Sequence, residues 1–295
     1  NDQIQSIDLT GGVGSVTCDF LEEGINLSGH VYHDNGLNMT DPDQIVDTST
    51  DAPIPGVFME LYDTDCSTAY VPYAGSLIFT DNTDAIGYYE FTNVPFDAYC
   101  IVENQPAAYD DGVEYAGNQG GDVPNNDTIQ AISIATIDGI NYDFLEEGIN
   151  LSGYVLHDNG YTMTDPNQIV DADDKPIEGV LVQMFDGTCT TQYVPYTGTM
   201  MFEHNTLADG YYEITNVPRD LYCLVETQPV NYLDGVEIAG NLGGDTPQND
   251  TIMMINLTED GILYYFLEEG INLSGYVYHD NGYELTAPDG IVDPT

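Results

Sequence analysis

The ten-residue stretch FLEEGINLSG occupies residues 20–29, and it returns unchanged at residues 144–153 and 266–275. Self-similarity at a fixed period is the signature of a repeat architecture. Ile25, Ile149 and Ile271 open equivalent units. We therefore predict two complete modules, 25–148 and 149–270, preceded by the end of another module at 1–24 and followed by the start of a further one at 271–295.

Both ends of the chain carry partial modules. Residues 1–24 resemble a module's end, because NDQIQSIDLTG and CDFLEEG match the NDTIQAISI and YDFLEEG segments of residues 126–148. Residues 271–295 repeat a module's start. We expect the chain to be a segment of a longer tandem array. The alternative is a separate subunit whose ends complete a neighbouring subunit by strand exchange.

Within a module, short runs rich in Tyr, Val, Ile, Phe and Thr are separated by Gly, Pro and Asp turn signals, without sustained helical periodicity. Val57, Met59 and Leu61 alternate with more polar neighbours, as one face of a strand does. In module one, we expect strands at 27–33, 56–63, 76–80, 88–94, 98–104, 127–134 and 140–146. This number of strands indicates an all-β fold, an antiparallel β-sandwich with tyrosines in its core.

The junctions between modules contain no Pro-rich or Ser-rich spacer, as the sequence EEGINLSG shows. Neighbouring modules are therefore expected to abut, which favours a rod of sandwiches joined head to tail.

The chain has 51 Asp and Glu residues and 2 Lys and Arg residues, a formal charge of −49. Nucleic-acid binding is excluded because no basic surface exists to displace phosphate counterions. Attraction to an anionic membrane fails for the same reason, and no apolar run is long enough for membrane insertion. Because a folded chain of this charge repels itself, we expect bound divalent cations or a salty medium.

Four of the five cysteines recur as equivalent pairs. Cys66 and Cys100 have the same separation in module one as Cys189 and Cys223 have in module two. We predict one disulfide within each module, and keep buried free thiols as the alternative. Cys18 stands where the other copies have tyrosine, so it is either unpaired or bonded to a neighbour. Paired cysteines indicate an oxidising, extracellular setting.

An ordered set of motifs runs through both modules. In module one it reads GHVYHD at 29–34, an Asp cluster, PIPGV at 53–57, GYYEFTNVP at 87–95, VENQP at 102–106 and NDTI at 126–129. This order resembles the B-repeat domains of serine-aspartate-repeat surface adhesins, within the prealbumin-like Cna-B group. The resemblance implies a calcium-stiffened extracellular sandwich that serves as a stalk or spacer at the cell surface, without catalytic activity.

The loop after the first strand of each module is acidic, and the resemblance implies that it binds Ca²⁺. Hard oxygen ligands at alternate positions of a turning loop suit calcium, which takes about six to eight oxygens. We expect Ile45 to anchor the loop to the core, and keep a merely solvated acidic loop as the alternative. The candidate ligands are Asp34, Asp41, Asp43, Asp47 and Asp51, then Asp158, Asp165, Asn167, Asp171 and Asp174, and in the tail Asp280, Asp289 and Asp293.

Two other sets of residues are weaker candidates. A second cation site is conceivable in an acidic segment that module two repeats only in part, although a solvated face is the simpler interpretation. Its members are Asp110, Asp111, Glu114 and Asp122, and in module two Asp234, Glu237 and Asp245. His33, His157 and His279 precede the three loops, and we expect them to be outward-facing strand residues and not metal ligands.

The sequence predicts a structural role: an extracellular stalk or filament of calcium-loaded sandwiches. The alternative is an adhesive module that binds a protein or carbohydrate through exposed loops. Near identity between residues 87–95 and 210–218 favours the spacer. We expect no enzyme, because no module repeats a Ser, His and Asp set or a phosphate-binding Gly-rich loop. Seven Asn-x-Ser/Thr sequons allow glycans.

Overall fold

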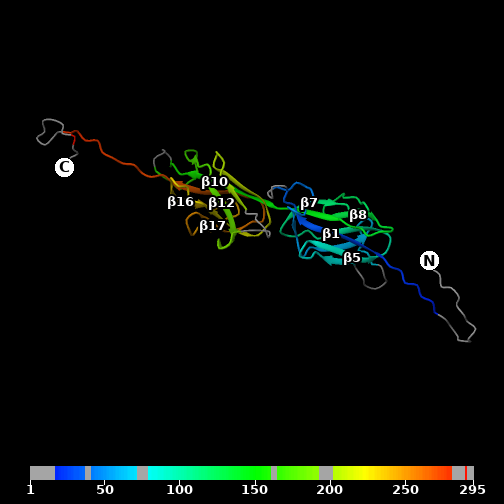
Figure 1. Cartoon of the computed structure of the whole chain (residues 1–295). Coiled ribbons are helices and arrows are strands. Elements are labelled where there is room, and N and C mark those ends of the chain that lie inside the picture. Colours follow the sequence, from blue (N-terminus) through cyan, green and yellow to red (C-terminus); the bar gives the residue numbers. More distant parts are fainter. Residues whose placement is uncertain are drawn as a thin grey trace, which may run out of the picture.

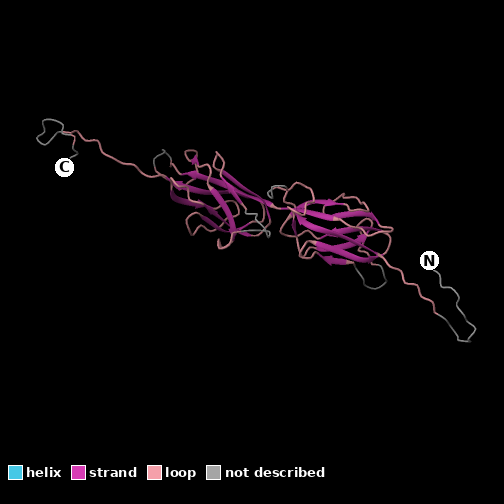
Figure 2. Ribbon diagram, in the orientation of Figure 1, coloured by secondary structure: helices cyan, strands magenta, loops and turns pink. Residues whose placement is uncertain are grey.

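A computed structural model describes residues 17–36, 41–71, 79–160, 165–192, 202–280 and 290. Every regular element among them is a β-strand, and the strands form two sandwiches that follow one another along the chain (Figure 1, Figure 2). The predicted all-β class is confirmed. The predicted module boundary at 148/149 falls between two strands, one from each sandwich. None of the described segments is an apolar helix of membrane-spanning length.

The first sandwich pairs a five-stranded sheet with a four-stranded one. The five-stranded sheet has the order β2 (Ala52–Pro53), β1 (Ile25–His33), β9 (Asp143–Glu147) and β7 (Asp110–Tyr115), and β5 (Tyr88–Val94) also pairs with β1. The four-stranded sheet has the order β4 (Thr80–Asn82), β3 (Phe58–Asp63), β6 (Ala98–Glu103) and β8 (Thr128–Ser133).

The second sandwich repeats this topology. Its five-stranded sheet contains β11 (Lys175–Pro176), β10 (Ile149–His157), β18 (Gly261–Glu269), β16 (Leu233–Ile238) and β14 (Tyr211–Val217), the last paired with β10. Its four-stranded sheet contains β13 (Glu203–Asn205), β12 (Leu181–Asp186), β15 (Leu221–Glu226) and β17 (Thr251–Asn256).

Alternating apolar residues build the core of each sandwich. Met59 and Leu61 in β3 are fully buried, as their alternation predicts. Tyr89 in β5 is also fully buried, and its hydroxyl donates a hydrogen bond to the carbonyl oxygen of Tyr142 at 2.7 Å. Since a buried hydroxyl with an acceptor avoids the cost of desolvation, tyrosine can serve as a large core residue here.

The repeated LSG motif has a packing reason. A Cβ atom at Gly29 would collide with the backbone carbonyl of Tyr142, which runs beside β1. Gly153 lies in the same position against Tyr264 in the second sandwich. Glycine at these positions therefore allows two backbones to approach closely.

Both predicted disulfides are present. Cys66 in the turn after β3 is bonded to Cys100 in β6, and Cys189 is bonded to Cys223 in the same place of the second sandwich. The Cα atoms of the two pairs lie 5.3 Å and 5.4 Å apart. Cys18 is exposed and has a free thiol.

The structure adds three features that the sequence did not predict. Strand β7 has the acidic sequence DDGVEY, which lacks the apolar alternation of the other strands. Strand β2 has only two residues. The first and last strands of each module, β1 with β9 and β10 with β18, pair in parallel within otherwise antiparallel sheets. Residues 76–78 of a predicted strand lie outside the described residues.

Candidate functional site: acidic loops and the module junction

The acidic loop of module one is closed by a buried carboxylate at the end of β1. Asp34 is 1% exposed. Its Oδ1 accepts a hydrogen bond from the backbone N–H of Asp43 at 3.0 Å, and its Oδ2 accepts one from Gln44 at 2.6 Å. Gln44 has a φ of 58°, in the left-handed region. The predicted ligands Asp34 and Asp43 are thus brought together through backbone contacts.

A second buried carboxylate closes the other side of the loop. Asp51 accepts hydrogen bonds from the backbone N–H groups of Asn35 at 3.2 Å and Asp47 at 2.6 Å. Burial raises the pKa of Asp51 to about 6; the two backbone bonds oppose this shift, and the charges of Asp34 and Asp43 add to it. A bound cation would stabilise a carboxylate in such surroundings.

Module two repeats the same closure. Asp158 accepts backbone hydrogen bonds from Asn167 at 2.9 Å and Gln168 at 2.6 Å. Asp174 accepts one from Asp171 at 2.8 Å. The two loops therefore share one hydrogen-bonding scheme.

The tail carries a third copy of this scheme in part. The N–H of Gly290 donates to Oδ2 of Asp280 at 2.7 Å, the bond that Gln44 and Gln168 make in the complete modules. Among the other predicted ligands, Asp41 and Asp165 are exposed, whereas Asp289 and Asp293 lie outside the described residues.

The donors of the loops are all hard oxygens, which fits calcium. In addition, Oδ1 of Asn35 is buried and lacks a hydrogen-bond partner among the described residues. The loop carboxylates, however, accept hydrogen bonds from backbone N–H groups. The groups of three acidic residues whose ligand atoms lie within 4.8 Å of one another are found elsewhere in the described segments. Calcium binding by these loops stays a prediction.

The predicted anchoring role of Ile45 is wrong. Its side chain is 60% exposed, and Ile169 at the equivalent position of module two is 62% exposed. The buried side chains of Asp34 and Asp158 fix the loops to the ends of the strands instead, because polar turns are held more readily by hydrogen bonds than by apolar contacts.

The end of β1 is also where module one meets module two. His33 is fully buried, and its Nε2 lies 2.9 Å from Oδ1 of Asn216, in β14 of the other sandwich. The Nδ2 of Asn216 donates to the carbonyl oxygen of Asp34 at 2.7 Å, and its Oδ1 also accepts from the N–H of Gly148 at 2.6 Å. The outward position predicted for His33 is therefore wrong, since Asn216 and the ring of Tyr109 cover it.

The electrostatics of this contact follow from burial. Burial lowers the pKa of His33 to about 4, although its hydrogen bond to Asn216 opposes the shift. At neutral pH the imidazole is thus uncharged. Because the amide oxygen of Asn216 can only accept, Nε2 of His33 carries the proton and donates it.

Module one has an equivalent of Asn216. Asn93 also has a φ of 57°, a left-handed conformation that asparagine tolerates better than most residues. Its Oδ1 accepts a hydrogen bond from the N–H of Gly24 at 2.6 Å, as that of Asn216 does from Gly148. Asn93 is exposed, whereas Asn216 is 2% exposed. The segment that precedes each sandwich is thus attached in the same way.

One of the two basic residues of the chain lies at the junction. The guanidinium of Arg219 pairs with Asp110, and its backbone N–H donates to the carbonyl oxygen of Ala108 at 2.7 Å. Module one has Phe96 at this position, within a segment that is otherwise nearly identical. This exchange of phenylalanine for arginine was the available sequence signal for the contact, and the sequence analysis did not use it.

The second predicted cluster is brought together only in part. In module two, ligand atoms of Asp234 and Glu237 lie within 4.8 Å of one another and of Asp250. Asp122 and Asp245 instead form isolated backbone bridges, with Gln130 and Met253. Asp250, which the prediction omitted, precedes β17.

The fold, the disulfides and the junction define a tandem β-sandwich repeat protein. No family model matches the chain. It is 26% identical to the serine-aspartate repeat-containing protein D of Staphylococcus aureus over 302 residues, 97% of this chain and 20% of the relative. It is 25% identical to colossin-A of Dictyostelium discoideum, over 80% of this chain and 2% of that protein. The chain thus spans a fifth or less of these relatives.

Among solved structures, the chain is similar to the Bacillus anthracis TIE protein, with a TM-score of 0.40 and 11% identity over 85% of this chain and 34% of that one. The major pilin from Streptococcus pyogenes gives a TM-score of 0.37 and 11% identity, over 85% of this chain and 100% of the pilin. The expected resemblance to serine-aspartate repeat proteins is confirmed by the sequence comparison. The two disulfides of this chain are typical of an oxidising, extracellular setting.

Proposed function

We propose that the chain is part of an extracellular stalk or filament, in which β-sandwich modules stack head to tail and calcium in the acidic loops stiffens each junction. The observation that carries this proposal is the junction itself. Asn216 contacts the linker at Gly148 and two residues of module one, and Arg219 adds an ion pair. The homology to surface repeat proteins supports the structural role.

The acidic loop and the junction share a residue, which suggests how one affects the other. The carboxylate of Asp34 closes the loop, while its backbone carbonyl accepts a hydrogen bond from Asn216. A calcium ion in the loop would supply positive charge that offsets the repulsion among its carboxylates. By holding Asp34 in place, a closed loop keeps the acceptor for Asn216 in position, and with it the angle between the modules.

Solution scattering and calorimetry of the whole chain test this proposal. In calcium, we expect a narrow distribution of module orientations and a higher melting temperature. In excess chelator, the orientations should broaden and the melting temperature should fall. Unchanged scattering and melting after chelation would count against calcium stiffening.

One feature favours the alternative role as an adhesive module. His30 pairs with Asp143 at 3.3 Å beside a cavity of about 380 Å³ in module one. In module two the equivalent residues, Tyr154 and Tyr265, stack on each other with ring centroids 5.7 Å apart. The two copies therefore differ here, as ligand-binding surfaces do. Carbohydrate or peptide binding that is lost in His30→Tyr would support adhesion.

A further inference from the structure

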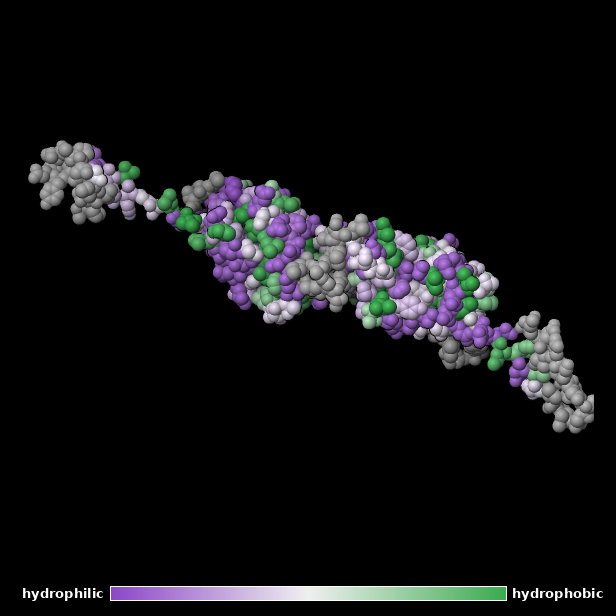
Figure 3. Space-filling model, viewed as in Figure 1, coloured by the Kyte–Doolittle hydropathy of each residue, from purple (hydrophilic) through white to green (hydrophobic). Residues whose placement is uncertain are grey.

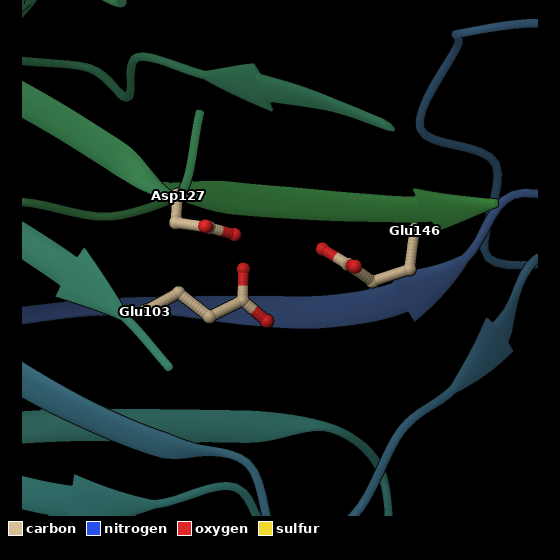
Figure 4. Close-up of side chains that lie close together, drawn as sticks. All are labelled: Glu103, Asp127 and Glu146. Atoms are coloured by element: carbon tan, nitrogen blue, oxygen red, sulfur yellow. The ribbon is translucent and has the colours of Figure 1, made fainter. Parts of the chain in front are cut away.

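Each module has an acidic group between its two sheets, apart from the acidic loop. In module one, Glu103 is the last residue of β6, Glu146 lies in β9 of the facing sheet, and Asp127 directly precedes β8. Figure 4 shows their carboxyl groups pointing toward one another. One oxygen of each lies within 4.8 Å of the others. We call this set the inter-sheet carboxylates.

Three oxygens of the inter-sheet carboxylates are buried without a hydrogen-bond partner among the described residues. Glu103 is 3% exposed, and neither of its carboxyl oxygens has a hydrogen-bond partner among the described residues. Oδ1 of Asp127 is likewise buried without a partner. Glu146 is 1% exposed and accepts a hydrogen bond from the side chain of Gln105. An unpaired buried carboxylate is costly unless a bound cation or a proton neutralises its charge.

Basic side chains do not fill this role. The chain has only two, and the described ion pairs of Lys and Arg include none of the three carboxylates. Arg219 pairs with Asp110 at the junction, and Lys175 donates to the carbonyl oxygen of Asp174 in module two. Lys and Arg side chains of the described residues therefore leave the inter-sheet carboxylates without a positive partner.

Module two repeats the arrangement. Glu226 ends β15 and is 3% exposed, and both of its carboxyl oxygens also lack a partner in the described part of the chain. Its ligand atoms lie within 4.8 Å of those of Asp250 and Glu268. Gln228 donates to Glu268 as Gln105 does to Glu146. The three carboxylates and the glutamine beside them thus recur in module two, which makes this a second copy of the same arrangement.

We propose that each set of inter-sheet carboxylates binds one calcium ion, held by Glu103, Asp127 and Glu146 in module one and by Glu226, Asp250 and Glu268 in module two. Oxygens bound to one calcium ion at about 2.3 to 2.6 Å lie at most about 5 Å apart, which the observed spacing satisfies. Three carboxylates offer up to six oxygens without nitrogen or sulfur, which favours calcium over zinc.

The position of this site gives it a structural consequence. The ion joins β6 and β9, which belong to different sheets. The carbonyl oxygen of Glu146 accepts a hydrogen bond from the N–H of Asp34 at 2.9 Å, so the site lies beside the loop that contacts module two. Calcium here would clamp the sandwich at the end that carries the junction.

The test uses the whole chain, stripped by chelator and titrated with calcium chloride alone. Titration calorimetry gives the number of ions bound and their affinity. In the double variant Glu103→Gln, Glu226→Gln, we expect two fewer ions per chain, or binding at least tenfold weaker. Glu60→Gln, on the outer face of β3, is the matched control and should bind as the original chain does.

Unchanged ion number and affinity in the double variant overturn the proposal, and leave the carboxylates as a proton-sharing group only. Equal affinity for magnesium chloride overturns the assignment to calcium. If the double variant fails to fold, Asp127→Asn with Asp250→Asn gives the same comparison.

The proposal does not rest on the stalk function. Removing the loop sites with Asp34→Asn and Asp158→Asn should leave the two inter-sheet ions bound. A failed scattering test with intact inter-sheet binding would therefore reject the calcium-stiffened stalk and keep the site.

Discussion

Nε2 of His33 lies 2.9 Å from Oδ1 of Asn216, across the boundary between two sandwiches and 183 positions apart in the sequence. Both side chains are buried, so the hydrogen bond is shielded from water. Removing one partner of such a bond leaves the other unsatisfied, which costs more than the bond itself contributes. The relative placement of the modules therefore depends on a few polar atoms. Much of the molecular face that Figure 3 shows is hydrophilic.

Replacing Asn216 by alanine should weaken the docking of the modules. The change removes the bonds to His33, Gly148 and the carbonyl oxygen of Asp34, and leaves the buried imidazole without its acceptor. We expect a loss of about 1 to 3 kcal/mol in the free energy of unfolding, and a wider distribution of module orientations. Denaturant unfolding and small-angle scattering measure the two effects.

Asn93→Ala is the matched control for this variant. It imposes the same change on a residue with the same φ, but Asn93 is exposed and its Oδ1 accepts from Gly24. Equal losses in both variants would mean that the backbone conformation matters and the contact with His33 does not.

Acidification should destabilise the junction through His33. Its pKa is about 4 in the folded chain and about 6.5 when exposed, so both states are neutral above pH 6.5 and no stability is lost there. As the pH falls toward 4, the exposed form takes up a proton that the buried form resists. The cost approaches about 2 kcal/mol at pH 5.

The measurement is the pH dependence of unfolding in the original chain and in His33→Gln. Asp34 and Glu146, which lie near His33, are present in both proteins, so the difference between the two curves isolates the imidazole. Parallel curves between pH 7 and pH 5 would contradict the assigned role of burial.

The sequence predicted what is local and repeated. Strand β5 has the predicted bounds, because the apolar residues at 89, 91 and 94 face the core. Glu103 could have been placed in the core from the alternation of side chains along a strand, but the sequence analysis did not apply this rule to it. Counting in steps of two along β6 places it on the core face with Tyr99 and Ile101, yet an acidic residue is ordinarily assigned to solvent.

The junction was not predictable by the same reasoning. Asn93 and Asn216 occupy the same TNVP motif, and one is exposed while the other is buried. The difference arises from a partner surface that is remote in sequence, namely His33 and Asp34. The sequence difference between Phe96 and Arg219 marks the second copy, but the partner surface is known only from the three-dimensional placement of the modules.

Loss of a disulfide should destabilise its own module. The bond between Cys66 and Cys100 closes a loop with a sequence separation of 34, and such closure contributes about 3 to 4 kcal/mol on the chain-entropy estimate. We expect Cys66→Ser with Cys100→Ser to lower the unfolding free energy of module one by this amount, as measured by denaturant titration. Cys18→Ser is the control, because this thiol is exposed and free, and an equal loss there would contradict the prediction.

Replacing Gln168 by glycine should stabilise the acidic loop of module two. Gln168 has a φ of 61° and an exposed side chain, and the tail has Gly290 with a φ of 75° at the equivalent position. A residue with a Cβ costs about 1 to 2 kcal/mol in this conformation, but glycine loses more backbone entropy on folding. The net gain should be at most about 1 kcal/mol, visible as a slightly higher melting temperature. Gln168→Ala keeps the Cβ and should give no gain, so equal behaviour of the two variants would show that backbone strain at this turn is negligible.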